Sequence, residues 1–173
     1  MSREVPFFRY RGLVYRAHNP KWSSAPVSGT GAMRRGGRFN RIGAPALYTS
    51  LDPKTAWMEA QQGFPFKPQP MTLVAYEVDC ADVVDLGDPD VQAALGVSIS
   101  DLAGAWEDMA SLGIHPLTWT LADRLIDDGV AAIIVQSFAP GCGPDDRNLV
   151  FWAWSEVPPH LVSAIDDHGR ASR

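Results

Sequence analysis

The residues best suited to chemistry are arginines, tyrosines, a glutamate, a serine and asparagines in short groups between positions 15 and 148. Arginine binds phosphate oxygens through two parallel N–H bonds, and a fixed carboxylate such as that of Glu59 stabilises positive charge that develops nearby. A tyrosine ring offers a face on which a planar group can stack. Together, these residue types suit a small anion held beside a carboxylate. The set consists of Tyr15, Arg16, Arg38, Asn40, Tyr48, Glu59, Ser137 and Asn148.

Basic residues are concentrated in the first third of the chain. The net charge is −5, yet residues 5–51 contain eight Lys and Arg and no acid, whereas residues 52–173 contain 19 acidic and six basic residues. A positive segment on an acidic body can focus a small anion into a cleft, although a solvated basic face or ion pairing between segments would explain the same pattern. The overall acidity argues against a general nucleic-acid binder. The densest part is MRRGGRFN, residues 33–40, in which Arg34, Arg35 and Arg38 lie beside two glycines and before Arg41.

Several common kinds of site are excluded by spacing. Cys80 and Cys142 have no metal-ligand spacing and the four histidines are scattered, so we expect no metal site, no disulfide framework and a reducing, cytoplasmic environment. The glycines of residues 29–37 lack the ending of a phosphate loop. No apolar run is long enough to cross a bilayer.

Taken one at a time, the candidate residues also have structural explanations. Glu59 on a helix surface is usually only solvated, and Arg16 would often pair with an acidic neighbour across a sheet. Tyr48, in a strand, could belong to the core. The functional interpretation therefore depends on the elements that bring these residues together.

The elements expected in the first half are short strands around one helix. Asp52 followed by Pro53 is a strong helix start, with Gly63 as the expected stop, and the helix places Thr55 and Glu59 on one face. Residues 19–37 are rich in Pro, Ser and Gly and are predicted to be a long loop. The predicted strands are residues 13–17, 37–40, 46–50 and 71–78, the last continued after a turn by 83–85.

The second half is predicted to be helical and then to return to strands. Residues 131–137 are almost entirely apolar, which indicates a central strand buried on both faces. The strands and helices do not alternate, so the fold class is α+β, in a single domain spanning residues 1–173. The predicted helices cover residues 89–95, 99–112 and 116–128, and residues 148–154 form the last predicted strand.

The order and spacing of these groups resemble the RES domain of bacterial toxin–antitoxin pairs. The resemblance runs over residues 13–154 and rests on Arg16, the segment GGRFN at 36–40, the segment YTS at 48–50, Glu59 and Ser137. Phe39 stands where the family usually has tryptophan, which keeps an aromatic ring. This resemblance implies an ADP-ribosyltransferase-like fold, with a mixed or antiparallel β core, a cleft and flanking helices. Residues 88–129 match no functional motif of the family.

The resemblance also implies an activity: cleavage of the nicotinamide–ribose bond of NAD⁺, with NAD⁺ as substrate and no metal. Glu59, Arg16 and Tyr48 are expected to be catalytic. Ser137 would bind the carboxamide or orient Glu59. The residues expected to contact the nucleotide are Tyr15, Arg38, Asn40, Ser137 and Asn148.

The resemblance does not decide where ADP-ribose goes. The members of this family degrade NAD⁺ or transfer ADP-ribose to a protein, and degradation is slightly favoured here. It further implies a small antitoxin with an Xre-like DNA-binding part, in a homodimer or a larger complex. Two alternatives stay open, namely a non-catalytic module that binds a nucleotide or a partner, and a nucleic-acid binder that uses Arg34–Arg41 and Trp22.

Overall fold

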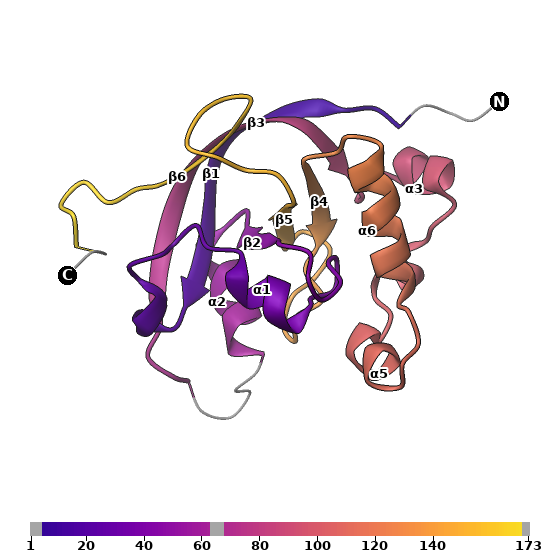
Figure 1. Cartoon of the computed structure of the whole chain (residues 1–173), viewed down its shortest axis with the longest axis horizontal. Helices are drawn as coiled ribbons and strands as arrows, with labels where there is room; N and C mark the ends of the chain where they lie inside the picture. Colours follow the sequence, from indigo (N-terminus) through magenta and orange to yellow (C-terminus); the bar gives the residue numbers. More distant parts are fainter. Residues whose placement is uncertain (1–4, 63–67, 171–173) are drawn as a thin grey trace.

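A ring of β-strands forms the centre of the molecule in the computed structural model, which describes residues 5–62 and 68–170. The strands are β1 (Phe8–His18), β2 (Leu47–Ser50), β3 (Thr72–Asp85), β4 (Ala132–Gln136), β5 (Arg147–Phe151) and β6 (His160–Ala164). The pairs β1–β2, β2–β5, β5–β4, β4–β3 and β3–β1 close the ring, and β6 pairs with β3 outside it (Figure 1). Within this set β3 and β4 run parallel and the other pairs are antiparallel.

Helices flank the ring, so the mixed α+β class predicted from the sequence is confirmed. Four of them lie between β3 and β4 in the chain and gather beside β4 (Figure 1). No helix of the described residues is long and apolar enough to cross a membrane. The helices are α1 (Thr30–Arg35), α2 (Pro53–Gln61), α3 (Pro89–Leu95), α4 (Ile99–Leu102), α5 (Trp106–Ser111) and α6 (Leu117–Asp127), with a 3₁₀ turn at Pro20–Trp22.

Apolar side chains are buried on both faces of β4. Ile134 packs inside the ring with Leu149 and Phe151, whereas Ile133 and Val135 face the helices. The prediction of a central strand buried on both faces is therefore confirmed, and it follows from the unbroken apolar run. Each large aliphatic side chain removed from water in this way contributes about 1.5–3 kcal/mol.

The start of α2 also agrees with the sequence. The Asp52 carboxylate accepts a hydrogen bond from the Thr55 amide at 2.9 Å, and Pro53 occupies the first turn. Thr55 is buried, and the helix packs on β1, which points Glu59 across the end of the ring. The expected stop, Gly63, lies outside the described residues.

β3 corrects one prediction, because residues 71–78 and 83–85 belong to a single strand. The ladder with β1 continues through the polar stretch that resembled a turn, and Arg9 and Arg11 on β1 both bind Asp79 within it. What changes along β3 is its partner on the other edge: residues 76–80 pair with β6, and residues 83–85 pair with β4. Asp82, with φ of 59°, lies at this change of partner.

Several other predicted elements differ from the structure. The expected loop 19–37 contains the 3₁₀ turn and α1. The helix expected at 99–112 is split into α4 and α5, because the carbonyl groups of Leu102 and Gly104 turn toward Arg38. Residues 37–40 form a tight turn in which Gly37 and Asn40 bond to each other, and β6 follows the strand that was predicted to be last.

Candidate active site

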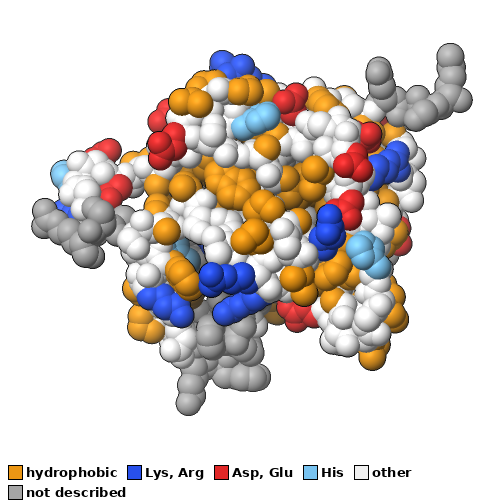
Figure 2. All heavy atoms as spheres, viewed as in Figure 1, with side chains coloured by type: hydrophobic (Ala, Val, Ile, Leu, Met, Phe, Trp, Pro, Cys, Tyr) orange, Lys and Arg blue, Asp and Glu red, His pale blue; other side chains and the backbone are white. Residues whose placement is uncertain are grey.

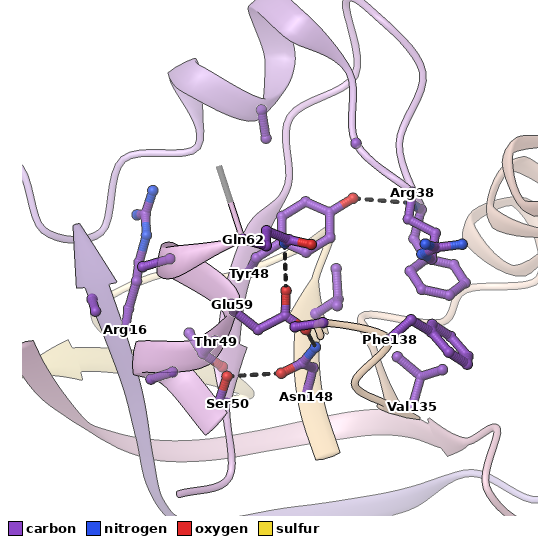
Figure 3. Close-up of a pocket in the computed structure, with 18 of the residues that line it drawn as sticks. Arg16, Arg38, Tyr48, Thr49, Ser50, Glu59, Gln62, Val135, Phe138 and Asn148 are labelled. Atoms are coloured by element: carbon purple, nitrogen blue, oxygen red, sulfur yellow. Dashed lines mark hydrogen bonds between the residues drawn. The ribbon is translucent and has the colours of Figure 1, made fainter. Parts of the chain in front are cut away.

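A cleft of about 530 Å³ opens at the end of the ring beside α2. β1, β2, β4 and β5 supply its floor, α2 one wall, and the segments around α1 and α5 the others (Figure 3). Of the eight residues singled out from the sequence, six line it, and the other two, Asn40 and Ser137, are buried behind it. The six are Tyr15 and Arg16 from β1, Arg38 from the tight turn, Tyr48 from β2, Glu59 from α2, and Asn148 from β5; Ser137 reaches the Glu59 carboxylate from the end of β4.

Glu59 is the centre of the hydrogen-bond network in this cleft. Its Oε1 accepts bonds from Ser137 Oγ at 2.6 Å and from Asn148 Nδ2 at 2.5 Å. Its Oε2 accepts a bond from Gln62 Nε2 at 2.9 Å. Together, these three bonds hold the carboxylate in one orientation.

Neighbouring strands place the two donors to Oε1. Asn148 on β5 pairs with Val135 on β4, and Ser137 follows directly after β4, with its amide bonded to the Asp146 carbonyl at 2.7 Å. Of the two contacts expected for Ser137, with the carboxamide or with Glu59, the structure contains the hydrogen bond to Glu59. Ser137 is 1% exposed, so its hydroxyl serves the carboxylate from within the protein.

The Tyr48 ring lines the cleft, and its hydroxyl forms hydrogen bonds within the protein. The hydroxyl donates to Asn40 Oδ1 at 2.7 Å and accepts from the Phe39 amide at 3.0 Å. Burial raises the pKa of the Tyr48 hydroxyl, so it stays neutral. Gly37 lies against this pair, because a Cβ there would overlap Tyr48 Oη and Asn40 Oδ1.

Asn40 has a structural role instead of the expected contact with a nucleotide. It is 1% exposed, and its amide nitrogen donates to the carbonyl groups of Ala32 and Ala44, each at 2.9 Å. Its amide oxygen is bound to Tyr48. Asn40 therefore shapes the turn that presents Arg38.

Arg16 and Arg38 lie on opposite sides of Glu59 (Figure 3). Arg38 Nη1 donates to the carbonyl groups of Gly104 at 2.6 Å and Leu102 at 3.0 Å, and its guanidinium lies 4.9 Å from the Phe138 ring centre. Arg16 Nη1 donates to the carbonyl groups of Ser28 at 3.2 Å and Pro26 at 3.4 Å.

Both arginines keep their positive charge available to the cleft. Within the described residues neither forms an ion pair with an acidic side chain. Burial lowers the pKa of the Arg38 guanidinium, and the nearby Glu59 carboxylate opposes this shift. Since an arginine pKa lies far above neutrality, the group stays charged.

The other arginines of the basic cluster divide between the cleft and the surface. Arg35 lines the cleft, whereas Arg41 forms a surface ion pair with Asp123 at 3.2 Å. Lys and Arg side chains gather beside α1 on the face shown in Figure 2.

Sequence reasoning missed further lining residues. Trp106 and Glu107 enter from α5, which carries no recognisable motif, and Phe138 comes from the loop after β4. For Gln62 a signal existed, because it follows Glu59 by three residues and so shares its helix face. No group of three or more His, Cys, Asp or Glu side chains with metal-binding geometry occurs among the residues that the structure describes.

Comparison with known proteins places this fold. No match was found among curated protein sequences. In the crystal structure of the MbcT–MbcA toxin–antitoxin complex of M. tuberculosis, one chain superposes with a TM-score of 0.64 at 19% identity, over 92% of this chain and 84% of that one. The two chains thus share a fold. Residues 13–173 match the RES domain, and the chain therefore belongs to the RES-domain family.

Proposed function

We propose that this RES-domain protein is the toxin of a toxin–antitoxin pair and that it cleaves the nicotinamide–ribose bond of NAD⁺. The observation that carries the proposal is the Glu59 carboxylate, which three donors hold between Arg16 and Arg38 in one cleft. The shared fold with a chain of a toxin–antitoxin complex supports the toxin assignment.

Cleavage of the nicotinamide–ribose bond requires few groups besides Glu59, Arg16, Arg38 and Tyr48. Nicotinamide leaves as a neutral molecule, so no proton has to be delivered to it, and the ribose carbon becomes positively charged in the manner of glycoside hydrolysis. The Glu59 carboxylate stabilises that charge. Arg16 and Arg38 bind the diphosphate, and the Tyr48 ring stacks on the nicotinamide.

The proposal favours NAD⁺ degradation, with transfer of ADP-ribose to a protein as the second outcome. The same residues would serve both, because the acceptor enters only after the bond to nicotinamide has begun to break. In the toxin assignment an antitoxin with an Xre-like DNA-binding part covers the cleft and holds the protein in a larger cytoplasmic complex.

Incubation of the purified protein with NAD⁺ labelled in the adenylate half, with and without cell lysate, tests the proposal. Free ADP-ribose or its phosphate indicates degradation, and a labelled protein band indicates transfer. Glu59→Gln, which keeps the shape of the side chain and removes its charge, is expected to lower the rate at least about 100-fold.

The same experiment decides against the alternative of a non-catalytic binding module. Such a module would bind NAD⁺ and leave it intact in both reactions. Intact NAD⁺ with the parent protein, or equal rates for the parent and Glu59→Gln, would overturn the proposed function.

A further inference from the structure

The two oxygens of the Glu59 carboxylate have different surroundings. Oε1 accepts bonds from Ser137 and Asn148, which are 1% and 9% exposed, whereas Oε2 accepts its bond from the exposed side chain of Gln62. A carboxylate oxygen has two acceptor positions. Counting the donors in the described part of the chain, Oε1 has both acceptor positions filled by buried side chains, and Oε2 has one position filled by Gln62 and one open on the side of the cleft.

Gln62 lies beside that open position. It caps the C-terminal end of α2, one helical turn after Glu59, and it lines the cleft (Figure 3). Its amide group carries two N–H donors and a carbonyl acceptor. One N–H is bound to Glu59 Oε2. Within residues 5–62 and 68–170 this amide has no other hydrogen-bond partner, so its second N–H and its carbonyl oxygen can bind a molecule that reaches the same place.

We propose that Gln62 positions the acceptor of ADP-ribose, by forming with Glu59 Oε2 a two-point site for an oxygen nucleophile. This inference rests on the proposed cleavage of NAD⁺. A glutamine that both donates and accepts can orient an attacking water, as glutamines do in GTPases. A neutral amide suits this place because a second carboxylate would repel Glu59.

In the proposed step, the acceptor oxygen replaces nicotinamide on the ribose carbon. The bond from the ribose carbon to nicotinamide breaks, and its electron pair leaves with nicotinamide. The acceptor oxygen forms the new bond to that carbon. When the acceptor is water, its proton passes to Glu59 Oε2 and then to solvent, so NAD⁺ and water become ADP-ribose, nicotinamide and a proton.

A competition between acceptors tests this role. The full chain is incubated with NAD⁺ in buffer that contains methanol, and in a second series inorganic phosphate, and the ADP-ribose, methyl ADP-ribose and ADP-ribose phosphate formed are separated and quantified. The proteins compared are the parent, Gln62→Ala and Gln62→Glu. Gln61→Ala is the control, because Gln61 is the preceding glutamine on α2 and is outside the set of residues that line the cleft.

The expected pattern differs from that of a structural defect. Gln62→Ala should lower kcat about 10- to 100-fold and change KM much less; this loss is at or below the lower end of the roughly 100- to 10,000-fold that a group transferring the proton itself contributes. It should also change the ratio of methanol product to water product at least about threefold, which corresponds to a difference of about 0.65 kcal/mol or more between the two barriers. Gln62→Glu should move the pH profile upward, because two adjacent carboxylates raise each other's pKa. Gln61→Ala should keep the parent's ratio.

The outcomes separate this inference from the proposed function. If the parent protein leaves NAD⁺ intact, the proposed function fails and this inference fails with it. If the parent cleaves NAD⁺ and Gln62→Ala keeps the parent's product ratios, this inference fails alone, whether or not the rate falls. Melting curves of all variants establish that they are folded.

Discussion

Ser50 Oγ on β2 donates a hydrogen bond to Asn148 Oδ1 on the neighbouring β5, at 2.7 Å. Since this bond occupies the amide oxygen, the amide nitrogen of Asn148 is left to face Glu59. Ser137, at the end of β4, donates to the same carboxylate oxygen of Glu59 as Asn148 does, namely Oε1. Residues from β2, β5 and β4 therefore together fix the orientation of one carboxylate.

Ser50→Ala should weaken catalysis through Asn148. Without the hydroxyl, the Asn148 amide can turn its oxygen toward Glu59, where it repels the carboxylate instead of binding it. We expect NAD⁺ cleavage to fall about tenfold, and the free energy of unfolding to fall by about 1–3 kcal/mol for an unpaired buried acceptor. Steady-state kinetics and urea unfolding measure the two effects. Ser50→Cys, a weaker donor of similar size, should lie between; a fully active Ser50→Ala would show that the orientation of Asn148 has another cause.

Tyr48→Phe should be active but less stable. The substitution keeps the ring in the cleft and removes the hydroxyl that joins Asn40 and the Phe39 amide. Two buried groups lose a partner, so we expect a loss of about 1–3 kcal/mol in the free energy of unfolding. At a temperature where the variant is folded, kcat should stay within about threefold of the parent, less than 1 kcal/mol in barrier height. A loss of kcat by several orders of magnitude would assign the hydroxyl a direct part in the chemistry.

Arg38→Ala should reduce NAD⁺ cleavage far more than Arg34→Ala. Arg38 lines the cleft, whereas Arg34 is exposed and lies outside the set of lining residues. We expect kcat/KM to fall about 100-fold or more for Arg38→Ala, which corresponds to about 2.7 kcal/mol. Arg38→Lys should restore only part of this, because lysine lacks the planar pair of donors. Equal effects of the two alanine variants would contradict the assignment of the diphosphate to Arg38.

Gly37→Ala and Gly31→Ala should have opposite effects on stability. A Cβ at Gly37 would overlap Tyr48 Oη and Asn40 Oδ1, so the turn must shift, at a cost of about 1–3 kcal/mol for overpacking. At Gly31, inside α1, nothing lies within 4 Å of the new atom. Alanine there should add about 0.5–1 kcal/mol through helix propensity. Thermal unfolding of the parent and the two variants measures these effects. An unchanged melting temperature for Gly37→Ala would mean that the turn has room for a Cβ beside Tyr48, contrary to the close contact described above.

Acid should weaken one surface contact between β1 and β3. The hydrogen bond from Arg9, together with Arg11, lowers the pKa of Asp79 to about 2. The pKa of Asp79 in the folded protein lies below its value of about 3.9 in the unfolded chain. The contribution of these ion pairs to the free energy of unfolding is therefore fully present above about pH 3.9 and disappears as the pH falls toward 2. The free energy of unfolding of the parent and of Asp79→Asn, measured from pH 6 to pH 2, should therefore converge in acid. High salt should reduce their difference at pH 6, and a difference independent of both pH and salt would contradict the ion pairs.

Local signals in the sequence determined several elements correctly. Asp52 and Pro53 specify the start of α2 because capping involves only adjacent residues, and the apolar run of residues 131–137 identifies a strand buried on both faces. The order of Arg16, Arg38, Tyr48 and Glu59 also indicated the RES domain, and residues 13–173 match it.

Only the tertiary structure shows which groups the residues of the cleft contact. Ser137 and Asn148 meet Glu59 across 78 and 89 positions of the chain, so no local pattern could show that they hold its carboxylate. A similar separation along the chain explains why Trp106, which comes from a segment without a motif, was missed, whereas Asn40 shapes the turn through partners only four to eight positions away. A sequence specifies residue types and short-range capping directly, whereas hydrogen-bond partners between strands depend on which chain segments the closed ring of strands brings together.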